Sequence, residues 1–344
     1  MHLVKLWPRS ALRTWPTNQT LFGALCWAVR YLLGADWLQS ALNELVERPG
    51  CLIISDALPF ISSRGRETYL LPKPASWDLL GSMPASLRTG DIKDVKRCRW
   101  VTASALNAAR AGDNRLEIVE GVICTQGEVE ELRGQLPRRT GEPHATVNRL
   151  TGSTTRPGRL FFLDGWALPS AGGFYVLLGA RGKWSEPVGG QGGLPVWQAA
   201  LRFAAETGVG GKRTAGKGTY EPEPSGLPQE FAALEARGTW LLLGRALAVG
   251  GSPEVCLWPL PEGSLYHLAI DHGRIDSAGT AIESFKGPAV LLEAGSVLSE
   301  GQWAVAGGEV PDGWRACGTA FRAGSLPDGG KTVAFGVAPC MPLP

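Results

Sequence analysis

Glycines and cations are concentrated in one short segment, Gly208–Gly218, and this composition is suited to binding phosphate. Five of the eleven residues are glycine, so the backbone can approach a ligand closely and point several N–H groups at it. The side chains of the segment add positive charge and a hydroxyl. We therefore predict a site for a phosphate-rich ligand formed by Gly208, Gly210, Gly211, Lys212, Arg213, Thr214, Gly216, Lys217 and Gly218.

A nucleotide P-loop is a poor interpretation of the same segment. Gly211, Gly216 and Lys217 have the required spacing, but Gly218 stands where a P-loop needs Ser or Thr. The segment also follows a predicted helix, whereas a P-loop precedes one. These departures exclude an NTPase, and the remaining alternative to a phosphate site is a mobile basic turn.

Two further basic stretches precede this segment. One holds Lys93, Lys96, Arg97 and Arg99, and the other, from Arg138 to Arg159, holds five arginines and one acidic residue. Basic stretches are more often solvated faces than binding sites, but three of them within one part of the chain favour RNA or DNA. The side chains that we expect to contact a phosphate backbone here are Arg138, Arg139, Asn148, Arg149, Thr151 and Arg156.

The histidines do not form a convincing catalytic or metal site. His267 and His272 flank Asp271, but no nucleophile motif accompanies them, and the spacing is not a zinc pattern. His144 lies in the second basic stretch and is the one histidine placed to act as a general base on RNA. We expect no metal, no cofactor and no enzymatic activity, with a ribonuclease that uses His144 as the alternative.

Composition gives the class of protein. The 344 residues carry a net charge of +2, but residues 1–220 hold 27 basic and 18 acidic side chains, and residues 221–344 hold 7 and 14. This asymmetry indicates a polyanion partner for the first part. The longest apolar run, 21–34, is interrupted by Arg30 and is too short to span a bilayer, so we expect no membrane contact and a cytoplasmic location. The seven cysteines lack metal-binding spacing and suit a reducing compartment.

The order of predicted elements indicates an α+β fold. Strands are expected at 2–7, 51–62, 69–74, 159–168 and 173–181, and helices from Leu21 through Leu45 and over Leu194–Thr207. The elements follow one another in the order strand, helix, strand, strand pair and helix. This order is a split βαβ pattern, the ferredoxin-like arrangement that RNA-binding sheets also use. Residues from about 76 to 157 are polar and show no sustained hydrophobic periodicity, and we predict a long basic insertion or projecting hairpin there.

A second, mostly β domain is expected beyond the Pro- and Glu-rich residues 221–228. Candidate strands lie at 240–249, 264–271, 289–298 and 331–337, with a helical signal only around 229–236. We therefore place the first domain at 1–225 and a smaller one at 226–344.

Several motifs together resemble the RAMP proteins of type III CRISPR effectors, and most closely subunit four of the type III-A Csm complex. They are Thr20–Leu25 (TLFGAL), Ile54–Phe60 (ISDALPF) with Tyr69–Pro74 (YLLPKP), Asn148–Gly152 (NRLTG) before Leu160-Phe161-Phe162, Gly208–Gly218, and Glu293–Val297 (EAGSV). The chain departs from the family at Thr17-Asn18-Gln19, where the family has His-Ser-Asp.

The resemblance implies two ferredoxin-like (RRM-like) RAMP domains and a non-catalytic role. Members of the family cap the filament on the crRNA, bind its 5′ handle, and contact the large polymerase/nuclease subunit and the adjacent backbone RAMP subunit in antiviral defence. By this resemblance, the glycine-rich segment and the start of the first helix, with Asn18 and Thr20, would hold the handle. The insertion would be a thumb that meets the guide–target RNA duplex.

Overall fold

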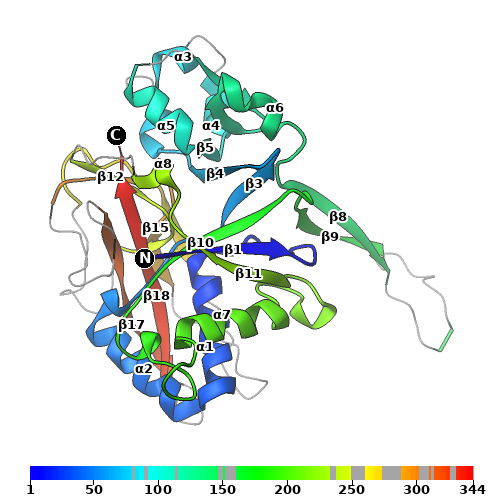
Figure 1. Cartoon of the computed structure of the whole chain (residues 1–344), viewed down its shortest axis with the longest axis vertical. Helices are drawn as coiled ribbons and strands as arrows, with labels where there is room; N and C mark the ends of the chain where they lie inside the picture. Colours follow the sequence, from blue (N-terminus) through cyan, green and yellow to red (C-terminus); the bar gives the residue numbers. More distant parts are fainter. Residues whose placement is uncertain are drawn as a thin grey trace.

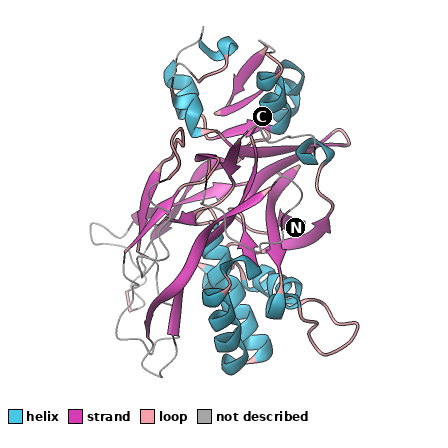
Figure 2. Ribbon diagram, turned by 90° about the vertical axis from the view of Figure 1, so that its left-hand side faces the viewer, coloured by secondary structure: helices cyan, strands magenta, loops and turns pink. Residues whose placement is uncertain are grey.

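The computed structural model describes residues 1–79, 82–88, 92–112, 115–145, 150–151, 160–232, 238–248, 260–272, 288–301, 310, 314–325 and 331–343. Their fold is mixed α+β with several sheets, as predicted (Figures 1 and 2). Within the described residues, no helix is long and apolar enough to cross a membrane.

Four antiparallel strands form the centre of the largest sheet. Their spatial order is β11 (Tyr220–Ser225), β1 (His2–Pro8), β10 (Gly172–Ala180) and β3 (Leu58–Ser63), and β2 (Leu52–Ile54) also pairs with β10. Strand β10 lies between β1 and β3 and is buried along its whole length. The strand predicted at 173–181 is thus confirmed as a central strand.

Two helices pack on one another beside this sheet, α1 (Asn18–Leu33) and α7 (Val196–Thr207). The Thr17 side chain caps α1 by accepting a hydrogen bond from the backbone N–H of Thr20, as its N-cap position favours. Apolar residues of α1 recur at helical spacing and are buried, namely Leu21, Phe22, Leu25, Ala28 and Val29. Gly34, with φ +91°, ends α1, and α2 (Ala35–Glu47) continues from it.

The opposite face of the central sheet is also covered. Leu3, Tyr175 and Leu177 are buried there together with Phe231 of α8 (Gln229–Ala232) and Leu241 of β12 (Thr239–Leu242). RNA-binding sheets of the ferredoxin-like type stack bases on an open face. Because this face is occupied by the chain itself, bases cannot stack on it, and a nucleic acid must bind elsewhere.

The predicted insertion is a packed extension of the sheet rather than one long hairpin. Strand β4 (Arg66–Pro72) pairs with β5 (Trp100–Thr102), which continues through β7 (Val122–Thr125) to β6 (Leu116–Val119). Short helices α3 (Ala85–Arg88), α4 (Ile92–Arg97), α5 (Ala103–Arg110) and α6 (Val129–Leu132) accompany these strands. Figure 1 shows this extension at one end of the molecule.

A two-stranded hairpin follows the extension and projects from the body of the molecule (Figure 1). Its strands are β8 (Arg138–Ala145) and β9 (Leu160–Ala167), paired from Arg138 opposite Ala167 to Ala145 opposite Leu160. Most side chains of the hairpin are at least partly exposed. The predicted projection therefore exists, but it comprises only the last part of the insertion.

The C-terminal part forms two smaller sheets. One has the order β16 (Val297–Ser299), β12, β18 (Lys331–Pro342) and β17 (Arg315–Ser325), and the other β13 (Ala246–Leu247), β15 (Ala289–Leu292) and β14 (Leu268–Asp271). Strand β17 was not predicted. The other predicted strands of this part are confirmed, although 240–249 and 289–298 each divide into two.

The N-terminal and C-terminal parts share one hydrophobic core. The ring of Phe22 in α1 stacks on that of Phe335 in β18, with centroids 4.3 Å apart and planes 13° from parallel. Val333 and Val337 of β18 lie in the same cluster as the buried face of α1. The core is thus continuous across the residues where we had placed a domain boundary.

Candidate nucleic-acid interface

The glycine-rich segment is a folded loop with several residues in the left-handed region. It begins at the end of α7 with Gly208 at φ +84° and contains Lys212 at φ +63°, followed by a single 3₁₀ turn, Arg213–Ala215. Val209 N–H donates to the Gly218 carbonyl at 2.9 Å, which closes the loop. A Cβ on Gly218 would lie 2.2 Å from the Val209 oxygen, so glycine is required there by space as well as by φ.

The loop packs against the segment that joins β1 to α1. Gly218 N–H donates to the Ala11 carbonyl at 3.1 Å, and Gly211 N–H lies 3.4 Å from the Thr14 hydroxyl oxygen. A Cβ on Gly210 would be only 2.8 Å from that same hydroxyl. These contacts bring Arg13 beside the loop, although it is some two hundred residues distant in the sequence.

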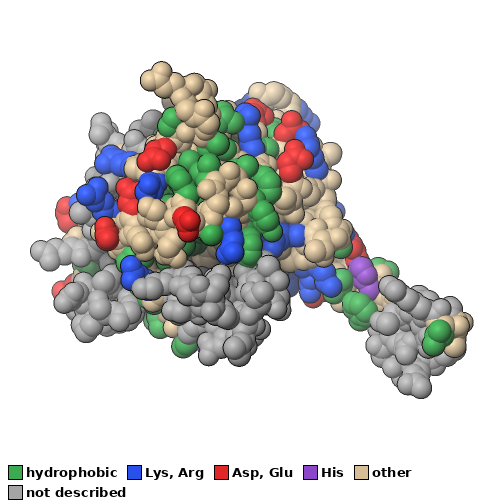
Figure 3. All heavy atoms as spheres, turned by 90° about the horizontal axis from the view of Figure 1, so that it is seen from below, with side chains coloured by type: hydrophobic (Ala, Val, Ile, Leu, Met, Phe, Trp, Pro, Cys, Tyr) green, Lys and Arg blue, Asp and Glu red, His purple; other side chains and the backbone are tan. Residues whose placement is uncertain are grey.

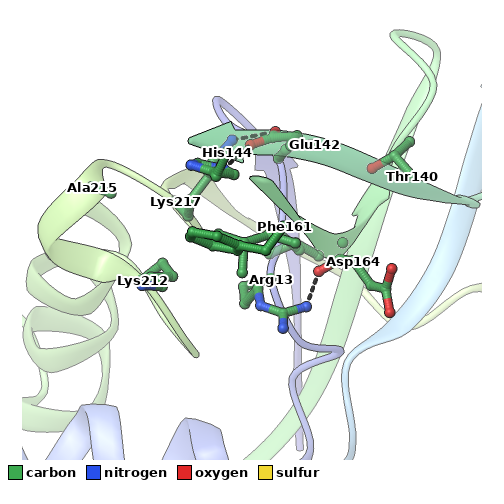
Figure 4. A pocket seen from close by; sticks show the side chains of 13 residues that line it. Arg13, Thr140, Glu142, His144, Phe161, Asp164, Lys212, Ala215 and Lys217 are labelled. Atoms are coloured by element: carbon green, nitrogen blue, oxygen red, sulfur yellow. Dashed lines mark hydrogen bonds and ion pairs between the residues drawn. The ribbon is translucent and has the colours of Figure 1, made fainter. Parts of the chain in front are cut away.

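One face of the hairpin lies opposite the loop and completes a cavity of about 210 Å³ (Figure 4). Lys217 Nζ reaches Glu142 Oε1 at 2.5 Å, and His144 Nε2 lies 3.6 Å from the other oxygen of that carboxylate. The His144 ring stacks on Phe161, with centroids 5.6 Å apart. Lining residues come from three separate segments, namely Ala11–Arg13, the hairpin residues Thr140, Glu142, His144, Phe161 and Leu163–Gly165, and Lys212, Ala215 and Lys217.

The cavity has cations on two sides and one engaged carboxylate. Arg13 donates a hydrogen bond to the Asp164 backbone carbonyl, and Lys212 is an exposed residue of the cavity lining. The hydrogen bond from Lys217 lowers the pKa of Glu142, against the opposing effect of desolvation, and the nearby His144 lowers this pKa further. The carboxyl is therefore ionised at neutral pH. A phosphate group that entered the cavity would compete with Glu142 for Lys217.

The two residues predicted at the start of the first helix differ in burial, since Thr20 is only half-buried. Asn18 is fully buried; its backbone N–H donates to Asp56 Oδ1 at 2.8 Å and its side-chain amide donates to the Arg245 carbonyl at 2.7 Å. The Thr20 hydroxyl lies 3.2 Å from that of Thr17. The Asn18 side chain therefore joins α1 to the C-terminal part and does not face a ligand in this structure.

Three of the predicted hairpin residues, Arg138, Arg139 and Thr151, are among the described residues, and three are not. Arg138 lies 3.7 Å from Glu120, whereas the Arg139 guanidinium lies over the Trp166 ring, 5.2 Å from its centroid. Thr151 is exposed. Asn148, Arg149 and Arg156 lie outside the described residues.

Arg13, Thr140 and Phe161 line the cavity but were not predicted. Arg13 belongs to no basic stretch, and its role depends on the packing of the loop on the β1–α1 connection. Thr140 and Phe161 face the cavity because of the alternation of side chains along β8 and β9, and the predicted hairpin could have indicated that face once its strand pairing was known.

The chain shows no second cluster that suggests metal or acid–base chemistry within the described residues. No group of three His, Cys, Asp or Glu side chains there could hold a metal ion. His267 lies 3.2 Å from Asp78 and is engaged in that pair. On the surface that Figure 3 shows, positive and negative side chains are interspersed, so the charge asymmetry of the sequence does not produce a uniform patch on that side.

Comparisons with known proteins support the motif-based resemblance. No family model matches the chain. A Csm4 protein of the CRISPR system of Thermococcus onnurineus (strain NA1) is 29% identical over 225 residues, which are 64% of this chain and 66%, just under two thirds, of that protein.

Two solved structures share the fold over nearly the whole chain. A chain of the Csm3–Csm4 subcomplex of a type III-A CRISPR-Cas interference complex has a TM-score of 0.58, with 16% identity and coverage of 97% of this chain and 98% of that one. A chain of a Csm1–Csm4 cassette in complex with pppApA has a TM-score of 0.57, with 16% identity and coverage of 100% and 97%. The resemblance indicated by the sequence motifs is therefore confirmed: this chain is similar to the Csm4 subunit of type III-A CRISPR complexes.

Proposed function

We propose that this chain is a non-catalytic subunit of a type III-A CRISPR effector complex that binds the 5′ handle of the crRNA and caps the RNA-bound filament. The observation that carries this proposal is the convergence of the glycine-rich loop, Arg13 and the hairpin on one cavity with Lys212 and Lys217 at its edge. Backbone N–H groups and these cations are suited to phosphates, which position a strand without reading its bases. The sequence similarity to a Csm4 protein supports the choice of complex.

The proposed RNA contacts extend from the loop to the hairpin. Phosphates would lie against Gly208–Gly218, with Lys212, Arg213, Thr214 and Lys217 as the charged and polar contacts. Arg138, Arg139 and Thr151 would follow along the hairpin, which we propose to project toward the guide–target RNA duplex, and Asn148, Arg149 and Arg156 complete the set in sequence. Asn18 and Thr20 would act indirectly, by holding the start of α1 beside the loop.

The proposed partners are the large polymerase/nuclease subunit and the adjacent backbone RAMP subunit. Csm4 proteins form a cassette with Csm1 and a subcomplex with Csm3, and this chain shares their fold over nearly its whole length. We propose that it bridges the two corresponding subunits in the cytoplasm. Among the described residues, the acidic C-terminal part contributes none to the cavity, so it is a suitable protein-facing surface.

The proposed architecture is two ferredoxin-like RAMP units, 1–225 and 226–344. Support for the first comes from the strand order β11–β1–β10–β3 and from α1 and α7, which connect its strands. For the second, support comes from a four-stranded antiparallel sheet. The continuous core indicates that these units would not fold independently.

An endoribonuclease that processes precursor crRNA is the second candidate, because His144 lines the same cavity. Its imidazole would act as the base toward a ribose hydroxyl. We favour the binding role because Glu142 is already held by Lys217. Incubation of the purified chain and its His144→Ala variant with precursor crRNA separates the two: cleavage by the first that the second lacks would support the enzyme.

The handle-binding proposal is tested by the salt dependence of RNA affinity. In the triple variant Lys212→Ala, Arg213→Ala, Lys217→Ala we expect weaker binding of single-stranded RNA with the handle sequence. The slope of log K against log salt should fall by about 2, since each lost phosphate contact on a single strand contributes about 0.7.

A matched control removes the same charge away from the cavity. Arg30 lies in the last turn of α1, Arg48 follows α2 and Lys183 lies in a 3₁₀ turn after β10, and none of them lines the cavity. The control is the variant Arg30→Ala, Arg48→Ala, Lys183→Ala. We expect wild-type affinity and slope from it. An unchanged slope in the loop variant, or equal losses in both variants, would contradict the assignment.

A further inference from the structure

Two arginines at the root of the hairpin lie against the same indole. The guanidinium carbon of Arg139 is 5.2 Å from the Trp166 ring centroid, and that of Arg99 is 5.6 Å from it. Trp15 and Trp100 support the arrangement, because Trp15 contacts both other indoles with centroids 5.1 and 5.5 Å away. We name Arg99, Trp166 and Arg139 the Arg–Trp–Arg cluster.

Neither guanidinium of the cluster is neutralised by a carboxylate among the described residues. The neighbouring Arg97 shows the usual situation, since it pairs with Asp94 at 3.4 Å. Burial against the rings and repulsion from Arg139 together lower the pKa of the Arg99 guanidinium. Two like charges are therefore held in one cluster, each stacked on an aromatic face.

The carboxylate that acts on Arg99 through space has its own partner. Glu293 acts on Arg99 through space, but its carboxylate lies 3.6 Å from the Arg245 guanidinium. The positive charge of the cluster thus remains available to an external anion.

The cluster lies on the opposite face of the hairpin from the cavity. Side chains alternate along β8 and β9, and the cross-strand pair Arg139–Trp166 precedes the pair Thr140–Gly165. Thr140, Glu142 and His144 line the cavity, so the Arg139–Trp166 pair must face away from it. Cations consequently stand on both sides of the hairpin root.

We propose that the Arg–Trp–Arg cluster is a second phosphate site for single-stranded RNA, and that the strand held by the glycine-rich loop passes around the hairpin root to reach it. The inference rests on the proposed function and adds a path for the RNA. Both guanidinium carbons lie within 5.6 Å of the same ring centroid, so their separation is at most about 11 Å and two successive phosphates of one strand can contact both. The planar guanidinium binds phosphate oxygens through its edge while its face stays on the indole.

The experiment compares RNAs of different length. Oligouridylates of about 4 to 16 nucleotides are titrated against the wild-type chain and the variant Arg99→Ala, Arg139→Ala. The shortest RNAs, which reach only the loop, should bind both proteins equally. With longer RNAs we expect the variant to bind at least several-fold more weakly, with a salt slope smaller by about 1.4, or about 0.7 for each lost cation.

Two further variants keep the result specific. Arg97→Ala with Arg133→Ala removes two neighbouring arginines that already pair with Asp94 and Glu130, and should leave binding at every length unchanged. Arg99→Lys with Arg139→Lys keeps the charge and should restore the salt slope. Because the two cations repel each other, the thermal midpoint of the alanine variant should not fall by more than that of the control.

The outcomes separate this inference from the proposed function. If the loop variant loses RNA binding while the Arg99/Arg139 variant binds every length normally, the second site is refuted and the handle-binding proposal stands. If the Arg99/Arg139 variant loses the shortest RNAs as strongly as the longest, the proposed path is wrong. If the wild-type chain binds none of the RNAs, both the second phosphate site and the handle-binding proposal are refuted.

Discussion

Asp56 allows a prediction about stability that can be worked out from its surroundings. It is 8% exposed and follows β2, and its Oδ1 accepts hydrogen bonds from the backbone N–H groups of Asn18 at 2.8 Å and Arg245 at 3.4 Å. Burial raises the pKa of this carboxyl from 3.8 to about 6, against the opposing effects of these hydrogen bonds and of the Arg245 charge. The folded chain therefore binds the Asp56 proton more tightly than the unfolded chain does.

The sign and size of the effect follow from this difference. A raised pKa in the folded state means that Asp56 favours folding most below about pH 4, and that this contribution is lost as the pH rises through about 6. A shift of about 2 pKa units corresponds to about 3 kcal/mol. The variant Asp56→Asn keeps an oxygen acceptor for both N–H groups but removes the charge. Its free energy of unfolding should equal that of the wild type near pH 4 and exceed it by up to about 3 kcal/mol above pH 7.

Urea denaturation followed by tryptophan fluorescence between pH 4 and 8 measures this difference. Asp36→Asn, at an exposed position of α2, is the matched control and should show no comparable rise. A variant of Asp56 that is less stable than the wild type at pH 7.5, or a difference that does not vary with pH, would refute the reasoning. The first result would mean that the start of α1 needs the carboxylate charge itself, and the second that ionisation of Asp56 does not determine the difference in stability.

Three further predictions concern the loop, the sheet and the hairpin. Gly218→Ala should destabilise the chain by about 2 kcal/mol or more in urea denaturation, because its Cβ would lie 2.2 Å from a backbone oxygen at a positive φ. Lys5→Ala should cost about 1–3 kcal/mol in the same assay, since Lys5 is almost buried and pairs with the partly exposed Glu67 at 2.6 Å; a loss below 0.5 kcal/mol would contradict this. Glu142→Gln should raise RNA affinity several-fold by releasing Lys217, and a decrease measured by fluorescence anisotropy would show that the carboxylate helps binding.

The parts of the fold with long regular patterns were predictable from the sequence. The apolar spacing predicted the start of α1 and both ends of α7 to within three residues. The extension between β4 and β8 was not predictable because its helices and strands are only three to eight residues long, too short to show a period. Val95 is the one buried residue of α4, and Ile123 lies in a run of only three buried apolar residues, Val122–Cys124.

The candidate site was predictable where its chemistry is local in sequence. The loop contains its glycines and cations within eleven residues, so composition alone indicated a phosphate site. Arg13 and Phe161 join the cavity only through the packing of distant segments. The burial of Asn18 had no local signal either, because its partners Asp56 and Arg245 come from other parts of the chain.

The stack of Phe22 on Phe335 determines when this chain can fold during synthesis. The buried face of α1 is covered first by α7 and completed by β18, so Phe22 stays without its stacking partner until residues 331–342 have left the ribosome. At about 5–20 residues per second, this interval lasts tens of seconds. For that time the part of α1 that β18 covers is an exposed hydrophobic surface, and we expect it to be where chaperones bind the nascent chain.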